Sequence, residues 1–392
     1  MRQIAYVGED GETSVYDLDL DSGIPVSQKV EPQATPGDHL TNWPTWSPAG
    51  DRLAYFRYEI VGGELTASGV CVAAPDGSGG ISLYRAEGEA PIYMCWSPDG
   101  QRIAALVQAQ EELYLRVVDA RGDRPPTTVA QGAPLYFAWL PDSRGLVVHV
   151  GLGRRSMPET RISWVRIEGG QVTQAPLARS PARAFRAPSW SNKLAAATLA
   201  LEGPEGSDIA VQRQADADVE TLFSTGLSPA FQWSPSGELL ACSSRTPDGG
   251  TLYSGISLYN AEDRSVRTLL DGPVLAFLWS PDSQRLVYAA GDVADRVVGI
   301  HVVDVGSGEV SAAGWVRPSR DLFMMFSYFD QYSQSVSLVS PDGAELVLAA
   351  SRAKERENGS VPTVRQILVR SLSGGAEERP IARGRLAFWR PA

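Results

Sequence analysis

The chain of 392 residues contains 43% hydrophobic and 21% charged residues, so it can bury a large core and is neither disordered nor fibrous. Its 35 basic and 46 acidic residues give a net charge of −11, which disfavours a nucleic-acid partner because an acidic surface repels phosphates. No apolar run approaches the roughly 18 residues of a membrane span, and the N-terminus lacks the apolar stretch of a signal peptide.

The number and spacing of the cysteines indicate the cellular compartment. Cys71, Cys95 and Cys242 are odd in number, far apart, and form no CxxC pair. A disulfide framework and a thiolate zinc site are therefore disfavoured, and buried free thiols are expected. Free thiols fit a cytoplasmic location; a leader removed from the chain would instead indicate a periplasmic or other extracytoplasmic one.

The first predicted elements are three strands within residues 3–30, which read QIAYV, SVYDLDL and PVSQKV. A tryptophan-bearing turn, WSPDG in its clearest form, then recurs at intervals of 43 to 60 residues. Seven of the ten tryptophans occupy this position, and one unit has valine instead. The anchors are Trp46, Trp96, Trp139, Trp190, Trp233, Trp279, Val339 and Trp389.

Each unit has the same internal order. A short apolar strand runs into the tryptophan, and a tight turn follows in which proline presets φ, aspartate or serine bonds to nearby backbone, and glycine accepts a positive φ. Two strands rich in β-branched and aromatic residues and a weaker fourth strand complete the unit. We interpret Asp99, Asp142, Asp282 and Asp342 as turn residues, and the tryptophans as packing between units.

Four antiparallel strands in about 49 residues are typical of a β-propeller blade. The sequence therefore predicts an all-β chain that forms a single β-propeller domain over residues 1–392, with few or no helices.

The W-S-P-D-G turn, followed by a charged residue and an apolar strand, resembles the TolB-like, or WD40-like PD40, propeller repeat. The resemblance covers nearly the whole chain. It implies a propeller fold and protein partners, but such repeats occur in scaffolds, hydrolase lids and lyases alike, so it does not fix a function.

The termini predict how the ring closes. The C-terminal RLAFWRP, from Arg385, reads as a first strand, and residues 3–30 supply the other three strands of the same blade. This closure would hide two open sheet edges and gives eight four-stranded blades. Seven is the alternative, should the unit at Trp190, whose turn lacks Pro-Asp-Gly, form no blade.

The longest interval carries an aromatic insertion at residues 315–334, before the first strand of the next blade. Its residues Tyr328, Phe329, Asp330, Gln331 and Tyr332 combine aromatic rings with a carboxylate and an amide, a composition typical of a recognition surface. The alternative is that the insertion buries its own aromatics and plugs the ring.

Other candidate ligand- or partner-binding residues are those that depart from the repeat near the predicted channel. They are Trp43, Tyr93, Tyr136, Arg186 and His39. The loop pair Arg154 and Arg155 offers a contact for an anionic partner, although a solvated loop is the simpler interpretation. No metal site and no cofactor are predicted.

The leading functional hypothesis is a non-catalytic scaffold that binds a protein, peptide or small ligand on one face or at the channel mouth. Enzyme motifs such as GxSxG and HExxH are missing, and only His39, His149 and His301 could serve metal or acid–base chemistry. The alternative is a propeller enzyme, a lyase or hydrolase, with its site at the channel mouth.

Overall fold

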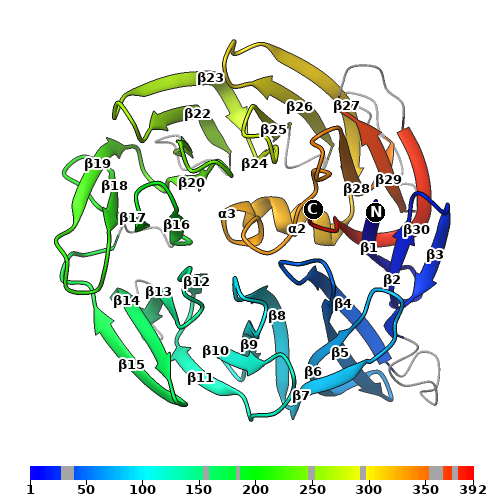
Figure 1. The fold of residues 1–392 in the computed structure, drawn as a ribbon. Coiled ribbons are helices and arrows are strands. Elements are labelled where there is room, and N and C mark those ends of the chain that lie inside the picture. Colours follow the sequence, from blue (N-terminus) through cyan, green and yellow to red (C-terminus); the bar gives the residue numbers. More distant parts are fainter. Residues whose placement is uncertain are drawn as a thin grey trace.

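The chain folds into a ring of antiparallel sheets around a central axis (Figure 1). The structure is a computed structural model that describes residues 1–27, 39–152, 159–181, 186–245, 252–291, 297–352, 365–372 and 378–392. Arg154 and Arg155 lie outside these ranges.

Five of the sheets have four strands each. The first contains β4 (His39–Trp46), β5 (Leu53–Val61), β6 (Glu64–Ala73) and β7 (Ile81–Glu87). The second contains β8 (Glu89–Trp96), β9 (Arg102–Ala109), β10 (Glu112–Asp119) and β11 (Thr127–Gln131). The third contains β12 (Leu135–Trp139), β13 (Gly145–Leu152), β14 (Glu159–Glu168) and β15 (Gln171–Pro176). The fourth contains β16 (Ser189–Ser191), β17 (Ala196–Glu202), β18 (Ser207–Gln212) and β19 (Glu220–Thr225). The fifth contains β20 (Ala230–Trp233), β21 (Leu239–Ser243), β22 (Tyr253–Asn260) and β23 (Val266–Val274).

The remaining strands form one ten-stranded sheet that joins the two ends of the chain. Its order is β24-β25-β26-β27-β28-β29-β30-β1-β2-β3. The strands are β24 (Ala276–Trp279), β25 (Arg285–Ala290), β26 (Val298–Asp304), β27 (Val310–Pro318), β28 (Glu345–Arg352), β29 (Gln366–Ser371), β30 (Glu378–Trp389), β1 (Gln3–Gly8), β2 (Thr13–Asp17) and β3 (Ser22–Pro25).

The repeated turns form the hydrogen bonds that their composition predicts. In the turn after Trp96, the Ser97 hydroxyl donates to Asp99 (2.6 Å), and the same carboxylate accepts from the backbone N–H of Gln101 (2.9 Å). Gly100 takes φ +64°, a left-handed conformation in which a Cβ would be strained. The turn geometry therefore explains why Pro, Asp and Gly recur, and it confirms that Asp99 is a turn residue.

Four of the repeated tryptophans form hydrogen bonds between neighbouring sheets or blades. In four cases the indole N–H donates to the carbonyl of the residue just before the tryptophan of the adjacent sheet. These bonds run from Trp46 to Phe388 (3.4 Å), Trp96 to Thr45 (2.9 Å), Trp139 to Cys95 (3.1 Å) and Trp279 to Gln232 (3.1 Å). The packing interpretation of the repeated tryptophans is thereby confirmed for these positions.

The core fills the spaces between adjacent sheets. Second and third strands such as β13 and β18 are buried almost throughout, because both faces of these sheets pack against a neighbour. The three cysteines are free and buried, as predicted, and burial raises the pKa of the Cys95 and Cys242 thiols to about 12.

Two helices at the centre of the ring were not expected from the sequence. They are α2 (Arg320–Ser327) and α3 (Phe329–Tyr332), and Figure 1 shows them inside the ring of sheets. Trp315 belongs to β27, so the segment outside the strands begins at Ser319 rather than at residue 315. We call residues 319–338 the plug segment.

Strand β30 pairs with two neighbouring strands. Residues 378–383 pair with β29, and the following residues pair with β1, from Gly384 opposite Gly8 to Trp389 opposite Ile4. The chain termini therefore share one sheet.

We predict that deleting residues 384–392 abolishes cooperative thermal unfolding, because the deletion exposes the edge of β1 and removes the buried Phe388 and Trp389. Circular dichroism melts and size-exclusion chromatography measure the effect. Deletion of Pro391 and Ala392 alone is the control and should leave the melt unchanged. A truncated chain that melts like the full one would show that the β30–β1 pairing is dispensable.

Candidate functional site

The plug segment is held at the ring centre by its own cap and by β30. The Ser319 hydroxyl accepts from the Leu322 backbone N–H (3.0 Å) and donates to the Arg385 carbonyl (2.6 Å). The Arg385 guanidinium also donates to the Asp321 carboxylate (2.8 Å). These bonds fix the start of α2, whose apolar residues Leu322 and Phe326 are buried.

Gln331 docks α3 onto the inner edge of a sheet. Its side-chain oxygen accepts from the Phe137 backbone N–H (3.0 Å), and its side-chain nitrogen donates to the Phe137 carbonyl (2.9 Å). Phe137 lies on β12, the innermost strand of its sheet, so both backbone groups would otherwise face the channel unpaired. The Tyr93 hydroxyl donates in turn to the Gln331 carbonyl (2.9 Å).

Aromatic contacts complete the docking. The Tyr332 ring stacks on Trp43 at 4.6 Å and meets Tyr93 edge-on at 5.0 Å. The Phe329 ring is fully buried and meets Phe277 at 4.6 Å. The insertion thus buries Phe326, Phe329 and Tyr332 at the ring centre, which is the plug arrangement offered by the sequence as the alternative to a recognition surface.

The plug separates two pockets. The first, which we call the aromatic pocket, has a volume of about 430 Å³ and lies at the ends where the first strands begin. Six of the ten predicted site residues line it. They are Trp43, Tyr93, Tyr136, Tyr328, Gln331 and Tyr332.

The rim of the aromatic pocket is apolar and exposed. Tyr328 is 45% exposed and Met324 is 38% exposed, both on the plug segment. None of the described residues that line the pocket is charged. The Asn42 side-chain oxygen, also in the lining, is buried and has no hydrogen-bond partner among the described residues.

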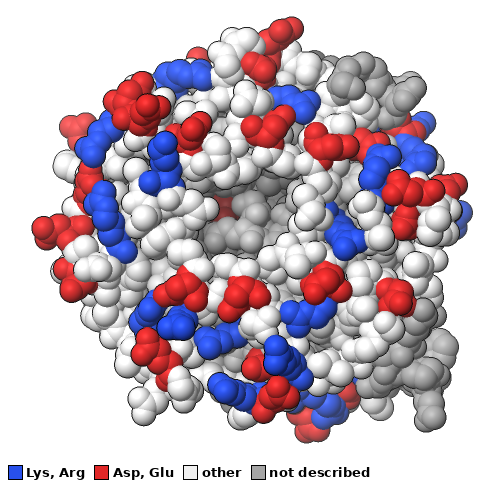
Figure 2. Space-filling model, in the orientation of Figure 1, with Lys and Arg blue, Asp and Glu red and all other residues white. Residues whose placement is uncertain are grey.

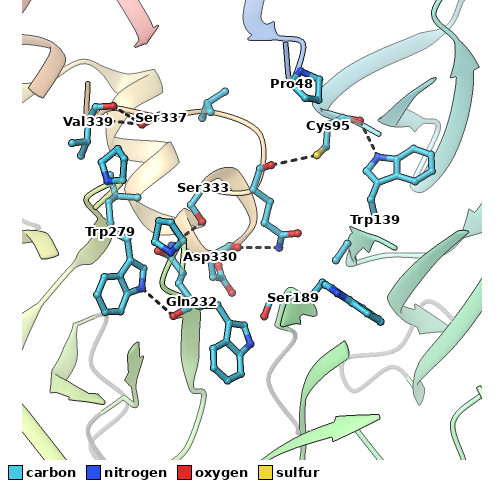
Figure 3. A pocket seen from close by; sticks show the side chains of 18 of the residues that line it. Pro48, Cys95, Trp139, Ser189, Gln232, Trp279, Asp330, Ser333, Ser337 and Val339 are labelled. Carbon is cyan, nitrogen blue, oxygen red and sulfur yellow. Dashed lines mark hydrogen bonds between the residues drawn. The ribbon is translucent and has the colours of Figure 1, made fainter. Parts of the chain in front are cut away.

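The second pocket opens among the repeated turns, and we call it the turn-face pocket. It has a volume of about 560 Å³. Its walls include turn prolines such as Pro48 and Pro281, and its floor includes Asp330, Ser333 and Gln334 of the plug (Figure 3). In space-filling view, the centre of the ring is hollow and the rim mixes acidic with basic side chains (Figure 2).

The other predicted site residues lie apart from the aromatic pocket. Phe329 is in the core, and Asp330 lines the turn-face pocket. The Arg186 guanidinium lies over the Tyr253 ring at 5.9 Å and donates to the Ser228 carbonyl (3.2 Å). His39, on β4, contacts Arg57 at 3.1 Å and lines neither pocket.

The histidines are dispersed. His39, His149 and His301 come from three different sheets, and burial lowers the pKa of His149 to about 4. Across the described ranges, no three His, Cys, Asp or Glu side chains group closely enough to hold a metal ion.

Sequence reasoning missed two polar residues of the turn-face pocket. Gln232 donates to the Phe329 carbonyl (3.3 Å) and the Ser333 hydroxyl (2.8 Å), and Ser189 lines the pocket directly before Trp190. A signal was present in both cases. Gln232 interrupts an otherwise apolar first strand, and Ser189 belongs to the unit whose turn departs from Pro-Asp-Gly.

Comparison with known proteins supports the fold. No protein-family model matches the chain, and no curated protein does. The solved β-propeller domain of the Trilobed protease from Pyrococcus furiosus is similar at 15% identity, with a TM-score of 0.53 over 89% of this chain and 97% of that one. Oligogalacturonate lyase in complex with manganese is similar at 14% identity, with a TM-score of 0.53 over 90% and 93%.

TolB from Acinetobacter baumannii is also among the similar structures, at 15% identity and a TM-score of 0.45 over 99% of this chain and 82% of that one. The first two matches, together with the ring of four-stranded sheets, define the chain as a β-propeller. At such low identities the comparisons establish the fold and nothing further.

Within the described part of the chain, no helix is both long and apolar enough to cross a membrane.

The ionised form of Asp330 is electrostatically unfavourable at its buried position. Burial raises the pKa of its carboxyl, while the charge of Arg186 and the Ala187 backbone N–H, 3.5 Å away, oppose that rise. A folded-state pKa above the unfolded one means that the folded protein holds this proton more tightly. Stability is therefore lost as pH rises from the unfolded pKa through the folded one.

We predict that Asp330→Asn raises the melting temperature at neutral pH, and that the gain shrinks as pH falls toward the ordinary carboxyl pKa. Asp342→Asn is the control of opposite sign, because hydrogen bonds from Ser340 and Ala344 lower the pKa of Asp342, so that its stabilisation is present at neutral pH and lost in acid. Calorimetric melts across pH distinguish the two. A lower melting temperature for Asp330→Asn at neutral pH would contradict the assignment.

Proposed function

We propose that the protein is a non-catalytic propeller scaffold whose aromatic pocket binds an apolar side chain of a protein or peptide partner. The observation that carries this proposal is the exposed apolar rim of Tyr328 and Met324 above a pocket lined by aromatic rings. Clustered, partly exposed aromatic residues are common at the energetic centres of binding surfaces.

The pocket is pre-organised for this task. Tyr332 is stacked on Trp43, and the hydroxyls of Tyr58 and Tyr93 are bonded to the carbonyls of Pro91 (2.8 Å) and Gln331 (2.9 Å). Rings that are already fixed lose little side-chain entropy when a ligand binds. The unpaired oxygen of Asn42 adds an acceptor, which suits a peptide N–H beside the bound side chain.

We also propose that the ring has eight blades. Strands β24–β27 would form one blade of the ten-stranded sheet. Strands β28, β29 and residues 378–383 of β30 would form the next, together with Val339, which bridges to Leu346. The second half of β30 with β1, β2 and β3 would close the ring. A cytoplasmic location stays a prediction from the sequence.

The test uses N-acetylphenylalanine amide as the probe and isothermal titration calorimetry as the measurement. We predict that Tyr328→Ala weakens its binding by about 1–2 kcal/mol, as expected for an exposed aromatic at a binding centre, without lowering the melting temperature. Tyr332→Ala is less suitable, because Tyr332 is buried against Trp43 and Tyr93, so its removal would also destabilise the plug.

Val266→Ala is the matched control, since Val266 is 48% exposed on the outer strand β23, away from the pocket. It should leave probe binding unchanged. Equal binding by the parent and by Tyr328→Ala, or no binding of the probe by the folded parent, would refute the proposed use of the aromatic pocket.

A further inference from the structure

The turn-face pocket contains a buried carboxylate without an ion-pair partner. Asp330 is 5% exposed and lines the pocket. Among the described residues, no cation lies within ion-pair distance of it, and its hydrogen bonds come from backbone N–H groups, of which that of Ala187 lies 3.5 Å away. A buried charge is normally paired, because removing an ion from water is energetically costly.

One hydroxyl on the lining of the same pocket has no hydrogen-bond partner among the described residues. The Ser189 hydroxyl is buried and makes no hydrogen bond to any described residue. Figure 3 shows Ser189 and Asp330 on the lining of the same space. A buried carboxylate without an ion-pair partner and an unpartnered hydroxyl on the same lining favour a ligand that donates hydrogen bonds.

The walls around these two acceptors suit a cation. Trp190 and Trp233 line the pocket and are both partly exposed, unlike the buried Trp96 and Trp139. The faces of exposed indole rings attract ammonium and guanidinium groups. Asp330 is the only charged residue among the described residues that line the pocket, so the pocket carries a net negative charge.

The arginine near Asp330 does not occupy this place. Arg186 is not part of the pocket lining, and its guanidinium is engaged with Tyr253 and the Ser228 carbonyl. Its charge favours the ionised form of Asp330 at longer range. Arg186 therefore leaves the carboxylate available to a ligand.

We propose that the turn-face pocket binds an organic ammonium group, with Asp330 as its counter-ion, Ser189 as a second acceptor, and Trp190 and Trp233 as its aromatic walls. This site is distinct from the aromatic pocket on the other side of the plug, and the proposal does not depend on the proposed function.

Butylammonium, 1-butanol and butyrate are the probes, because they share an alkyl chain and differ in charge. Calorimetric titration at constant ionic strength should detect binding of butylammonium and much weaker binding of the other two. Asp330→Asn keeps the shape of the side chain and should weaken butylammonium binding by about tenfold or more, as expected when a charge-assisted hydrogen bond is lost. Ser189→Ala should weaken it less.

Glu238→Gln is the control, because Glu238 is an exposed carboxylate in a repeated turn on the same face and does not line the pocket. It removes the same charge and should leave binding unchanged. Equal loss in Glu238→Gln and Asp330→Asn would mean that only the general surface charge attracts the probe, and would overturn the proposal. Equal binding of butanol and butylammonium, or no butylammonium binding by the folded parent, would overturn it as well.

Discussion

The unpaired backbone of the innermost strands is the constraint on which the centre of this molecule depends. Each sheet of a propeller ends at the channel in a strand that has a partner on one side only, so its outward backbone groups need another source of hydrogen bonds. Here Gln331 supplies them for Phe137 through both atoms of its amide. The plug segment is therefore part of the hydrogen-bonding system of the ring, and it divides the channel into two pockets of different chemistry.

The two pockets differ because α3 and the two residues after it present different side chains to each pocket. Gln331 and Tyr332 line the aromatic pocket, whereas Asp330, Ser333 and Gln334 line the turn-face pocket. This short segment thus provides uncharged side chains to one pocket and a carboxylate to the other. In the functions that we propose, the aromatic pocket binds apolar groups and the turn-face pocket binds cations.

The repeat made the strands and turns predictable, because each unit shows the same tryptophan, proline and glycine pattern at a regular interval. The helices were not predictable in the same way. The segment 321–334 is aromatic but lies outside the repeat, so its composition fits a recognition surface as well as a plug. Only the docking partners decide between these, and residues such as Phe137 and Trp43 lie about 190 to 290 positions away in the chain.

Hydrogen exchange of the plug's backbone amides tests most directly whether the plug segment is a structural part of the ring. If it is, the amides of residues 329–334 exchange as slowly as those of the innermost strands, and Gln331→Ala accelerates exchange at Phe137 together with the plug. Exchange of residues 329–334 at the rate of an exposed loop, with Phe137 unaffected by Gln331→Ala, would contradict this structural role.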